Sequence, residues 1–535
     1  MTVADAKATG PRPSRRVDPV AEPGPLATRG DLVALASALV LITVAAVVGH
    51  EMNRRGVHMF LPRPPLLAYW HPHLGWGTPL AVWCVVLGLQ LQRVARLSWR
   101  RLLLAGWLLN LAWLCSLALV DGLRRGWIEV LLNPNEYLHD LPRISDPAAF
   151  LSSFTHYIAF GPGVGDDQVW TTHVAGHPPL ATLIFWLLAR VGLGGGFWAG
   201  ALCILVGSAA SVALPVAIRE LGAEDAARRL VPSVALFPGA VWMAVSADGL
   251  FAGVALSGLA LLCRGAMRGR ILASALGGLL VGVAVFLSYG LMLLGLVVLL
   301  VLVLSLRQRR LTPIHGTTSL SRVSNRPLAE RSQPHHGLSA ARVRSVLGPW
   351  LAATLGFAAV VAVHLALGFN WLAGLAALRV RYYQGIASHR LYSYFVYGNL
   401  AAWLVSCSPL LALGIARSIA ALRLRRRPAA AERSPIPRPN AGEDVAPDRT
   451  MAPWLGAGSW PSARIVALLA LSGVLAALVA DLSGLSKAET ERIWLSFGLI
   501  AYSGMALLRS RTASVALLAS ATWALLVNHL LNTGW

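Results

Sequence analysis

The chain has 535 residues, of which 56% are hydrophobic and only 13% are charged. This composition excludes an ordinary soluble enzyme, because soluble domains carry about 25% charged residues. The net charge of +22 comes almost entirely from arginine, in short clusters between apolar runs. That placement is typical of cytoplasmic loops in membrane proteins and argues against a nucleic-acid partner. The five cysteines have no paired spacing, so neither a disulfide framework nor a zinc site is predicted.

Apolar runs long enough to cross a lipid bilayer follow one another along the chain. They predict an all-α, polytopic bundle of transmembrane helices, with about 13 spans. The predicted spans are roughly 32–49, 77–92, 102–120, 197–218, 230–246, 248–263, 271–287, 290–306, 347–367, 398–416, 464–480, 493–508 and 513–531.

One further segment, 177–193, is apolar enough to cross the membrane, but it opens with two prolines and ends in glycine-rich sequence. Whether this segment crosses decides the topology of everything after it. If it does not cross the membrane, 34 of the 46 lysines and arginines share the side of the N-terminus; if it crosses, only 15 do. Since basic residues concentrate in cytoplasmic loops, we expect a re-entrant or juxtamembrane helix beneath a long outer loop. The alternative is that 177–193 spans and another short run does not. The preferred topology places the N-terminus in the cytoplasm and the C-terminus outside a plasma membrane.

Polar stretches divide the predicted bundle into parts. Residues 307–346 and 419–462 lack apolar periodicity and are predicted to be disordered cytoplasmic linkers, as is the N-terminus, 1–31. The resulting parts are two extra N-terminal spans in 32–101, a core in 102–306 with outer loop 121–196, spans in 347–418 with outer loop 369–397, and spans in 463–535 with outer loop 481–492. No internal repeat is visible, so the inverted-repeat design of many transporters has no support.

Ionisable residues gather on the predicted outer side. Asp121, Asp248 and Asp481 stand at the ends of spans, where a carboxylate is costly unless it meets water or a partner. Five cations contradict the positive-inside trend, namely Arg379, Arg381, Arg390, Lys487 and Arg492. Since a guanidinium offers a bidentate fork to phosphate oxygens, we predict that these cations bind a phosphate at headgroup depth. The alternative is that they pair with Glu489, Glu491 and Asp481, and both can hold at once.

Several motifs stand in an order that resembles the GT-C superfamily of integral membrane glycosyltransferases. Asp121 follows a span and opens the loop 122–176, which closes with HPPL at His177–Leu180. The motif SADGLF at Ser246–Phe251 resembles one in the branch that depends on lipid-linked mannose. The resemblance covers roughly 102–510. It implies a GT-C-like core that transfers a sugar from a polyprenyl-phosphate donor to a glycan or glycolipid acceptor of the cell envelope.

The implied chemistry needs a carboxylate to take the proton of an acceptor hydroxyl, and cationic groups to stabilise the departing lipid phosphate. Asp121 is the predicted base, although it could simply cap the next helix. No tight acidic pair follows it, so Glu136 and Asp140 remain rival bases. The predicted substrate contacts are His173, His177, Asp248, Tyr289 and the five outer cations. No cofactor or metal is expected: the spacing of His173 and His177 with Asp166 and Asp167 matches no compact ligand pattern.

Two other functions compete with a glycosyltransferase. A transporter or flippase of lipid-linked sugars would need ionisable residues within its spans. The predicted spans are nearly free of such residues, with His364 as the exception, which argues against this function. A non-catalytic protein of envelope assembly would not need the polar outer loops. The sequence does not identify the donor sugar, the acceptor or the linkage.

Overall fold

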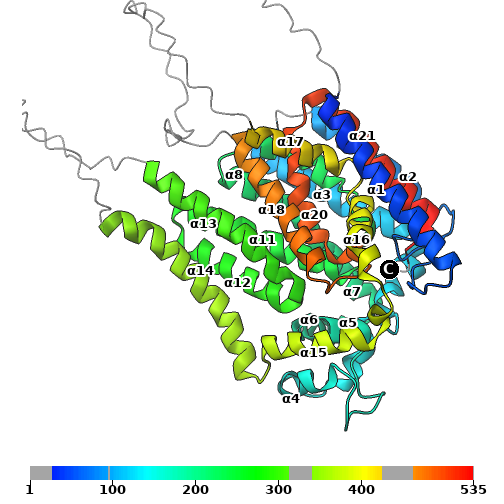
Figure 1. Ribbon diagram of the computed structural model, residues 1–535. Coiled ribbons are helices and arrows are strands. Elements are labelled where there is room, and N and C mark those ends of the chain that lie inside the picture. The colour runs from blue at the N-terminus through cyan, green and yellow to red at the C-terminus, as the bar shows by residue number, and fades with distance from the viewer. Residues whose placement is uncertain (1–26, 94–96, 312–339, 424–461, 534–535) are drawn as a thin grey trace, which may run out of the picture.

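The structure, a computed structural model, describes residues 27–93, 97–311, 340–423 and 462–533. These residues are mostly helical, which confirms the predicted all-α class (Figure 1). The strands β1 (Tyr69–Trp70) and β2 (Leu531–Asn532) pair antiparallel, and no other strand occurs in the described part of the chain. The predicted linkers lie largely outside the described residues.

Long helices form a bundle, joined by shorter ones. Its main helices are α1 (Arg29–Arg54), α2 (Gly77–Arg93), α3 (Trp99–Ala118), α7 (Gly196–Ser208), α8 (Ala210–Glu220), α11 (Ala247–Arg268), α12 (Ile271–Leu287), α13 (Leu294–Leu311), α14 (Ala340–Ala366), α18 (Ser462–Leu482), α20 (Leu495–Tyr502) and α21 (Ser510–Leu530). Within the described ranges, eight helical stretches are long and apolar enough to cross a membrane, or nine if one bent pair counts as a span. The chain is therefore a multi-pass membrane protein, while the predicted count of about 13 spans remains a prediction.

Two expected spans are interrupted. The segment 230–246 is not one helix: α9 (Glu224–Ala235) ends before Pro238, and a single short turn, α10 (Ala240–Met243), follows. The segment 398–416 is split into α16 (Tyr392–Ser406) and α17 (Leu411–Arg423), which meet at 102°. Pro238 and Pro409 stand at these breaks, where their missing N–H groups cannot continue a helical ladder. In both places the helix is therefore interrupted although the sequence remains apolar.

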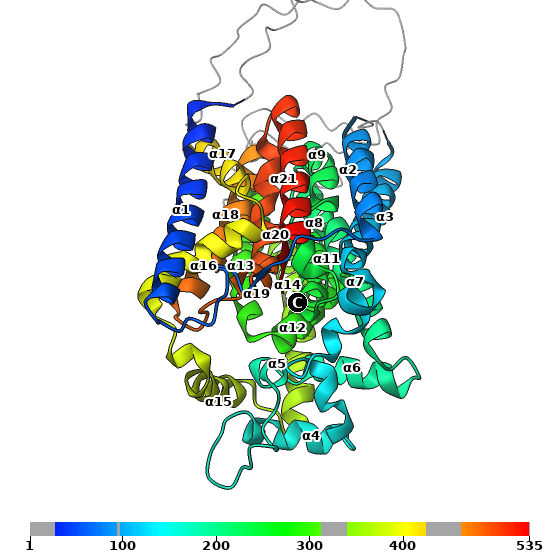
Figure 2. The ribbon, with the colours of Figure 1, turned by 90° about the vertical axis from the view of Figure 1, so that its right-hand side faces the viewer.

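The outer loops expected from the sequence meet at one end of the bundle. Helices α4 (Pro147–Ser153), α5 (Thr172–Gly176), α6 (Leu180–Arg190) and α15 (Trp371–Gln384) lie there together, with α17 at the opposite end (Figures 1 and 2). The Phe160 N–H donates to Gln384 Oε1 at 2.9 Å, and Gln384 Nε2 donates back to the Phe160 carbonyl at 2.8 Å. The loops 121–196 and 369–397 therefore lie on the same side, which we call the loop end.

Helix α6 is too short to cross a membrane by itself. Its 11 residues rise about 16 Å at 1.5 Å per residue, against a hydrocarbon core of about 30 Å. It packs beside the 3-10 helix of residues Tyr137–Arg143, and Trp186 Nε1 donates to the Ile144 carbonyl at 2.9 Å. This packing suits the expected helix that returns toward the bundle without spanning it.

The shared loop end predicts the outcome of site-directed labelling. Gly161→Cys and Gly385→Cys introduce thiols at exposed positions where an added Cβ meets no close neighbour. In intact cells, both should react with a membrane-impermeant maleimide. Thiols at 320 and 440, which lie outside the described residues, should react only after permeabilisation. Labelling of the wild-type chain gives the background reaction of the native cysteines, four of which are buried. Opposite accessibility of 161 and 385 would contradict this fold.

Candidate functional site

A polar cleft of about 200 Å³ opens where α3 ends. Residues Leu119–Asp121 continue α3 as a 3-10 turn, which carries the carboxylate of Asp121 to the cleft. The polar residues that line the cleft are Asp121, Arg125, Glu129, Asn133, Ser246, Asn528, Asn532 and Thr533. They come from the long loop, from the residue before α11 and from the C-terminus of the chain. The side chain of Asp121 is 27% exposed, so it is supported by protein yet open to a ligand.

Two segments far apart in sequence meet at Asp121. His73 Nε2 lies 3.2 Å from Asp121 Oδ1, and Arg125 Nη2 lies 3.9 Å from the same oxygen. The His73 N–H donates to the His529 carbonyl at 2.9 Å, in line with the β1–β2 pairing. Gly75 and Gly77 let this segment cross the end of α3, because a Cβ at either position would lie 1.9 Å from a backbone oxygen. The segment that joins the two N-terminal spans therefore contacts the site.

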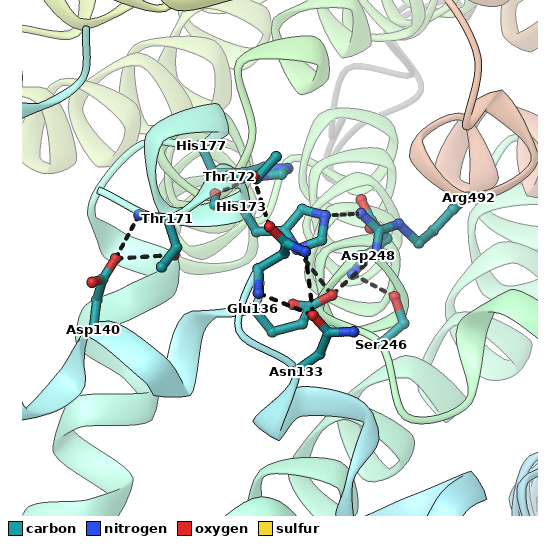
Figure 3. Close-up of polar contacts among 11 residues, drawn as sticks. Asn133, Glu136, Asp140, Thr171, Thr172, His173, His177, Ser246, Asp248 and Arg492 are labelled. Atoms are coloured by element: carbon teal, nitrogen blue, oxygen red, sulfur yellow. Dashed lines mark hydrogen bonds and ion pairs between the residues drawn. The ribbon is translucent and has the colours of Figure 1, made fainter. Parts of the chain in front are cut away.

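A buried network of charges centres on the Arg492 guanidinium (Figure 3). Its Nη1 lies 3.2 Å from Glu136 Oε1, and its Nε lies 3.0 Å from Asp248 Oδ2. Its Nη2 lies 2.7 Å from His173 Nε2, and His173 Nδ1 lies 3.0 Å from Glu136 Oε1. The network thus joins both ends of the long loop to the start of α11 and to α19 (Thr490–Ile493).

The network fixes the ionisation of Glu136 and Arg492. Burial by itself raises the pKa of Glu136, but His173 and Arg492 lower it to about 2. Burial likewise lowers the pKa of Arg492, while Asp248 and Glu136 raise it above its ordinary range. An arginine has no acceptor, so a hydrogen bond from Arg492 requires His173 Nε2 to accept and places the ring proton on Nδ1, facing Glu136. Glu136 is therefore a held anion, which makes it a weak proton acceptor.

The network lies directly behind the cleft. Ser246 and Asn133 line the cleft, and each is tied to a member of the network. The Asp248 N–H donates to Ser246 Oγ at 3.1 Å, which caps α11. The Glu136 N–H donates to the Asn133 carbonyl at 2.8 Å. Figure 3 shows Asn133 and Ser246 side by side next to Glu136 and Asp248. The ion pairs thus position one wall of the cleft.

Asp140 holds the loop together and does not line the cleft. Its Oδ2 accepts from the Thr171 N–H at 2.8 Å and from Thr171 Oγ1 at 2.9 Å. Its Oδ1 accepts from Arg143 Nη1 at 2.8 Å, and the Arg143 guanidinium stacks on the Trp170 ring, 4.2 Å from its centroid. With its side chain 1% exposed and both oxygens engaged, Asp140 closes the loop on itself.

The other predicted contacts of the core are buried away from the cleft. His177 Nδ1 donates to the His173 carbonyl at 2.9 Å, and burial lowers the pKa of His177. Its ring packs against Tyr137 and Phe251. Tyr289 packs against Trp371, and its hydroxyl has no hydrogen-bond partner among the residues described. Neither residue lines the cleft, so their predicted roles as substrate contacts have no support from its geometry.

The five outer cations do not form one phosphate site. Arg379 is exposed on α15, and Arg381 stacks on Phe160, 3.9 Å from its centroid. Arg390 is buried: it donates to the Met59 and Lys487 carbonyls and lies 3.6 Å from Glu489 Oε1. Lys487 Nζ donates to the Ala387 carbonyl at 3.1 Å. The ion-pair alternative is therefore correct for Arg390 with Glu489. Arg492 pairs with Glu136 and Asp248, which that alternative did not name.

Two carboxyl groups expected to pair with these cations are buried in other surroundings. Asp481 accepts from Asn399 Nδ2 at 2.9 Å. Glu491 Oε1 accepts from the Leu67 N–H at 3.4 Å, and its Oε2 has no hydrogen-bond partner in the described part of the chain. Burial raises the pKa of Glu491 to about 7. Glu491 is therefore a protonation-sensitive contact between α19 and the segment before α2.

Removal of the central guanidinium should strongly destabilise the protein. Arg492→Ala leaves the buried carboxylates of Glu136 and Asp248 without their shared cation, which costs about 3–5 kcal/mol. The thermal midpoint of purified protein in lipid nanodiscs should fall sharply. The matched control is Arg379→Ala, which removes an exposed arginine of the same loop end and should change stability by less than about 0.5 kcal/mol. Equal midpoints for the two variants would show that the network contributes little.

Glu491 should make stability depend on pH. Its pKa is raised from 4.5 to about 7 in the folded protein, so the folded state binds the extra proton and loses stability as pH rises through 4.5 to 7. Glu491→Gln should remove this loss and raise the free energy of unfolding at pH 8 by up to about 3 kcal/mol. At pH 5 the variant should resemble the wild type. Glu51→Gln, at a partly exposed carboxylate, is the control; parallel pH profiles of Glu491→Gln and the wild type would contradict the assignment.

Comparisons with protein-family models, with curated proteins and with solved structures found no match. The resemblance to the GT-C superfamily therefore remains a prediction. Among the residues that the structure describes, no group of three or more histidine, cysteine, aspartate or glutamate side chains is placed to hold a metal ion. The alternative site of His173 and His177 with Asp166 and Asp167 is not assembled, since both histidines are buried and both aspartates are exposed. The function must be argued from the cleft itself.

Proposed function

We propose that the protein is a membrane glycosyltransferase that moves a sugar from a polyprenyl-phosphate donor to a cell-envelope acceptor at the outer face of the plasma membrane. One observation carries the proposal: the carboxylate of Asp121 faces a polar cleft at the loop end of a multi-pass bundle. A lipid-linked donor brings its sugar to this depth while its chain stays in the bilayer. An acceptor reaches the same cleft from the water.

Asp121 is the base that the geometry supports best. The rival carboxylates Glu136 and Asp140 are buried and are held by Arg492, Thr171 and Arg143. Asp121 is partly exposed, and its closest polar neighbour, His73, leaves the face toward the cleft open. A general base must come within hydrogen-bond reach of the proton that it removes. Of the three candidates, only Asp121 lines the cleft.

The lining of the cleft suits a carbohydrate. Sugars present hydroxyl groups that donate and accept, and the amides of Asn133, Asn528 and Asn532 can do both. Ser246 and Thr533 add hydroxyl groups, and Trp242 adds an aromatic ring to the apolar part of the wall. A few polar groups at fixed positions in a concave site can orient a sugar and make its binding specific.

The reaction needs one proton transfer and one displacement. The acceptor hydroxyl gives its proton to Asp121 as its oxygen forms a bond to the anomeric carbon of the donor. The bond from that carbon to the phosphate oxygen breaks, and the electron pair leaves with the lipid phosphate. Arg125 is the cation that lines the cleft, with a side chain 53% exposed, and it replaces Arg390 and Arg492 as the proposed phosphate contact.

The proposal predicts the effect of one substitution. Asp121→Asn keeps the size and polarity of the side chain but cannot accept the proton, so turnover should fall by about 100-fold or more. Purified protein in lipid vesicles is supplied with radiolabelled polyprenyl-phosphate sugars and an envelope lipid extract, and labelled product is measured. Glu51→Gln, which changes a partly exposed carboxylate near the end of α1 and away from the cleft, should leave turnover unchanged.

Two outcomes would count against the proposal. If Asp121→Asn turns over at the wild-type rate, Asp121 is structural and Glu136 or Asp140 becomes the candidate base. If the amide variants of all three carboxylates remain active, base catalysis by this site is excluded. Thermal midpoints are measured in parallel, because loss of a helix cap alone costs about 1 kcal/mol.

A further inference from the structure

The segment that joins α1 to α2 carries a group of exposed apolar side chains. Tyr69, Trp70, Leu74 and Trp76 are each more than half exposed, and Trp76 is 89% exposed. An exposed apolar patch of this kind marks a surface that contacts a protein, a ligand or a membrane. We call residues 69–76 the crossing segment, and its position in the bundle decides which of these partners it fits.

One side of the crossing segment is fastened to the end of α21. The strands β1 and β2 pair, and the His71 and His73 N–H groups donate to the Leu530 and His529 carbonyls, both at 2.9 Å. Leu530 is the last residue of an apolar stretch, Ser510–Leu530, that is long enough to cross a membrane. Figure 2 shows the segment between α1 and α2 running across this end of α21. The crossing segment therefore lies at the level where that span ends.

The other side lies over the end of a second span. A Cβ added at Gly75 would lie 1.9 Å from the Val120 carbonyl oxygen, so the two backbones touch. Val120 belongs to the last turn of Trp99–Asp121, another stretch that is long and apolar enough to cross a membrane. Two span ends thus fix the depth of the crossing segment at the boundary between the hydrocarbon of the bilayer and the water beyond it.

The composition of this region suits contact with lipid. Between Arg63 and Arg93 the sequence contains no lysine, arginine, aspartate or glutamate, so no formal charge would have to leave water. Backbone N–H groups must also be satisfied within the protein at this depth. Those of residues 71 and 73 are bonded to α21, and the Gly75 N–H donates to Thr78 Oγ1 at 3.1 Å.

We propose that the crossing segment is a membrane anchor, in which Trp70, Leu74 and Trp76 insert into the leaflet at the loop end, where lipid headgroups meet acyl chains. Tryptophan and tyrosine concentrate at this depth in membrane proteins, because their rings are apolar while their N–H or O–H group can reach water. Leu80 and Trp83, which are more than half exposed on α2, continue the apolar surface toward the interior of the bilayer.

The anchor has a consequence for the cleft. Asp121 directly follows Val120, which the crossing segment touches, and its side chain lines the cleft. The anchor therefore holds the cleft at the surface of the bilayer. The inference itself does not depend on the proposed function, since it concerns the contact with lipid and not the reaction.

The test measures the depth of a nitroxide attached to the crossing segment. Leu74→Cys in the full chain is spin-labelled and reconstituted in phosphatidylcholine vesicles. Collision rates of the nitroxide are measured with molecular oxygen, which concentrates among acyl chains, and with a neutral nickel chelate, which stays in water. Gly161→Cys, at an exposed position of the long loop, is the water reference, and Leu518→Cys, on α21, is the lipid reference. The wild-type chain, treated in the same way, gives the background from native cysteines.

The ratio of oxygen to nickel collision rates at position 74 should be several-fold higher than at 161 and should approach that at 518. Trp76→Cys should give the same result, which guards against a local effect of one substitution. A ratio equal to that at 161 would overturn the anchor, because the segment would then face water, where a soluble partner or a glycan could reach it. Low rates for both reagents would also overturn it, because protein would then cover the segment. No activity is needed, so the anchor can fail while the proposed transferase stands, and the transferase can fail while the anchor stands.

Discussion

One buried cation organises the loop end of this protein. Arg492 compensates the charges of Glu136 and Asp248 in surroundings that exclude water. A buried charge is costly unless it is paired, so the segments that carry these residues must come together as a set. Glu136 belongs to the long loop, Asp248 to the start of α11 and Arg492 to the segment after α18. The wall of the cleft made by Asn133 and Ser246 depends on that set.

A second constraint brings the segment before α2 to the C-terminal end of α21, beside the cleft. The segment before α2 crosses the end of α3, where Gly75 and Gly77 leave room for backbone contact, and β1 pairs with β2. This crossing brings His73 to Asp121 and brings Asn532 and Thr533 into the lining of the cleft. The cleft is thus lined by the end of α3, the long loop, the segment before α11 and the C-terminal end of the chain, which explains why no continuous motif describes it.

The ionisable residues of the loop end divide into two groups by burial. Glu136, Asp140, Arg390 and Arg492 are buried and bonded to other parts of the protein, so they hold segments in place. Asp121 and Arg125 line the cleft and are partly exposed, so they remain able to meet a ligand. The expectation that Arg390 and Arg492 bind a phosphate does not suit their buried surroundings. Their charge is used inside the protein, and Arg125 carries the charge that a phosphate could reach.

The sequence by itself determined the class of fold, since apolar runs and a shortage of charge leave a helical membrane bundle as the solution for this chain. It also singled out Asp121, Glu136, His173, Asp248 and Arg492, because polar groups at span ends and outer cations are conspicuous in such a chain. Only the tertiary structure decided which carboxylate stays open and which cations are paired, because ion-pair partners hundreds of residues apart leave no trace in local spacing. His73 was missed because its contact with Asp121 also joins two separate segments of the chain. Its only signal was a polar HPHLGWG segment before an apolar run, and its partner Asp121 is brought to it by the crossing of the N-terminal segment over α3.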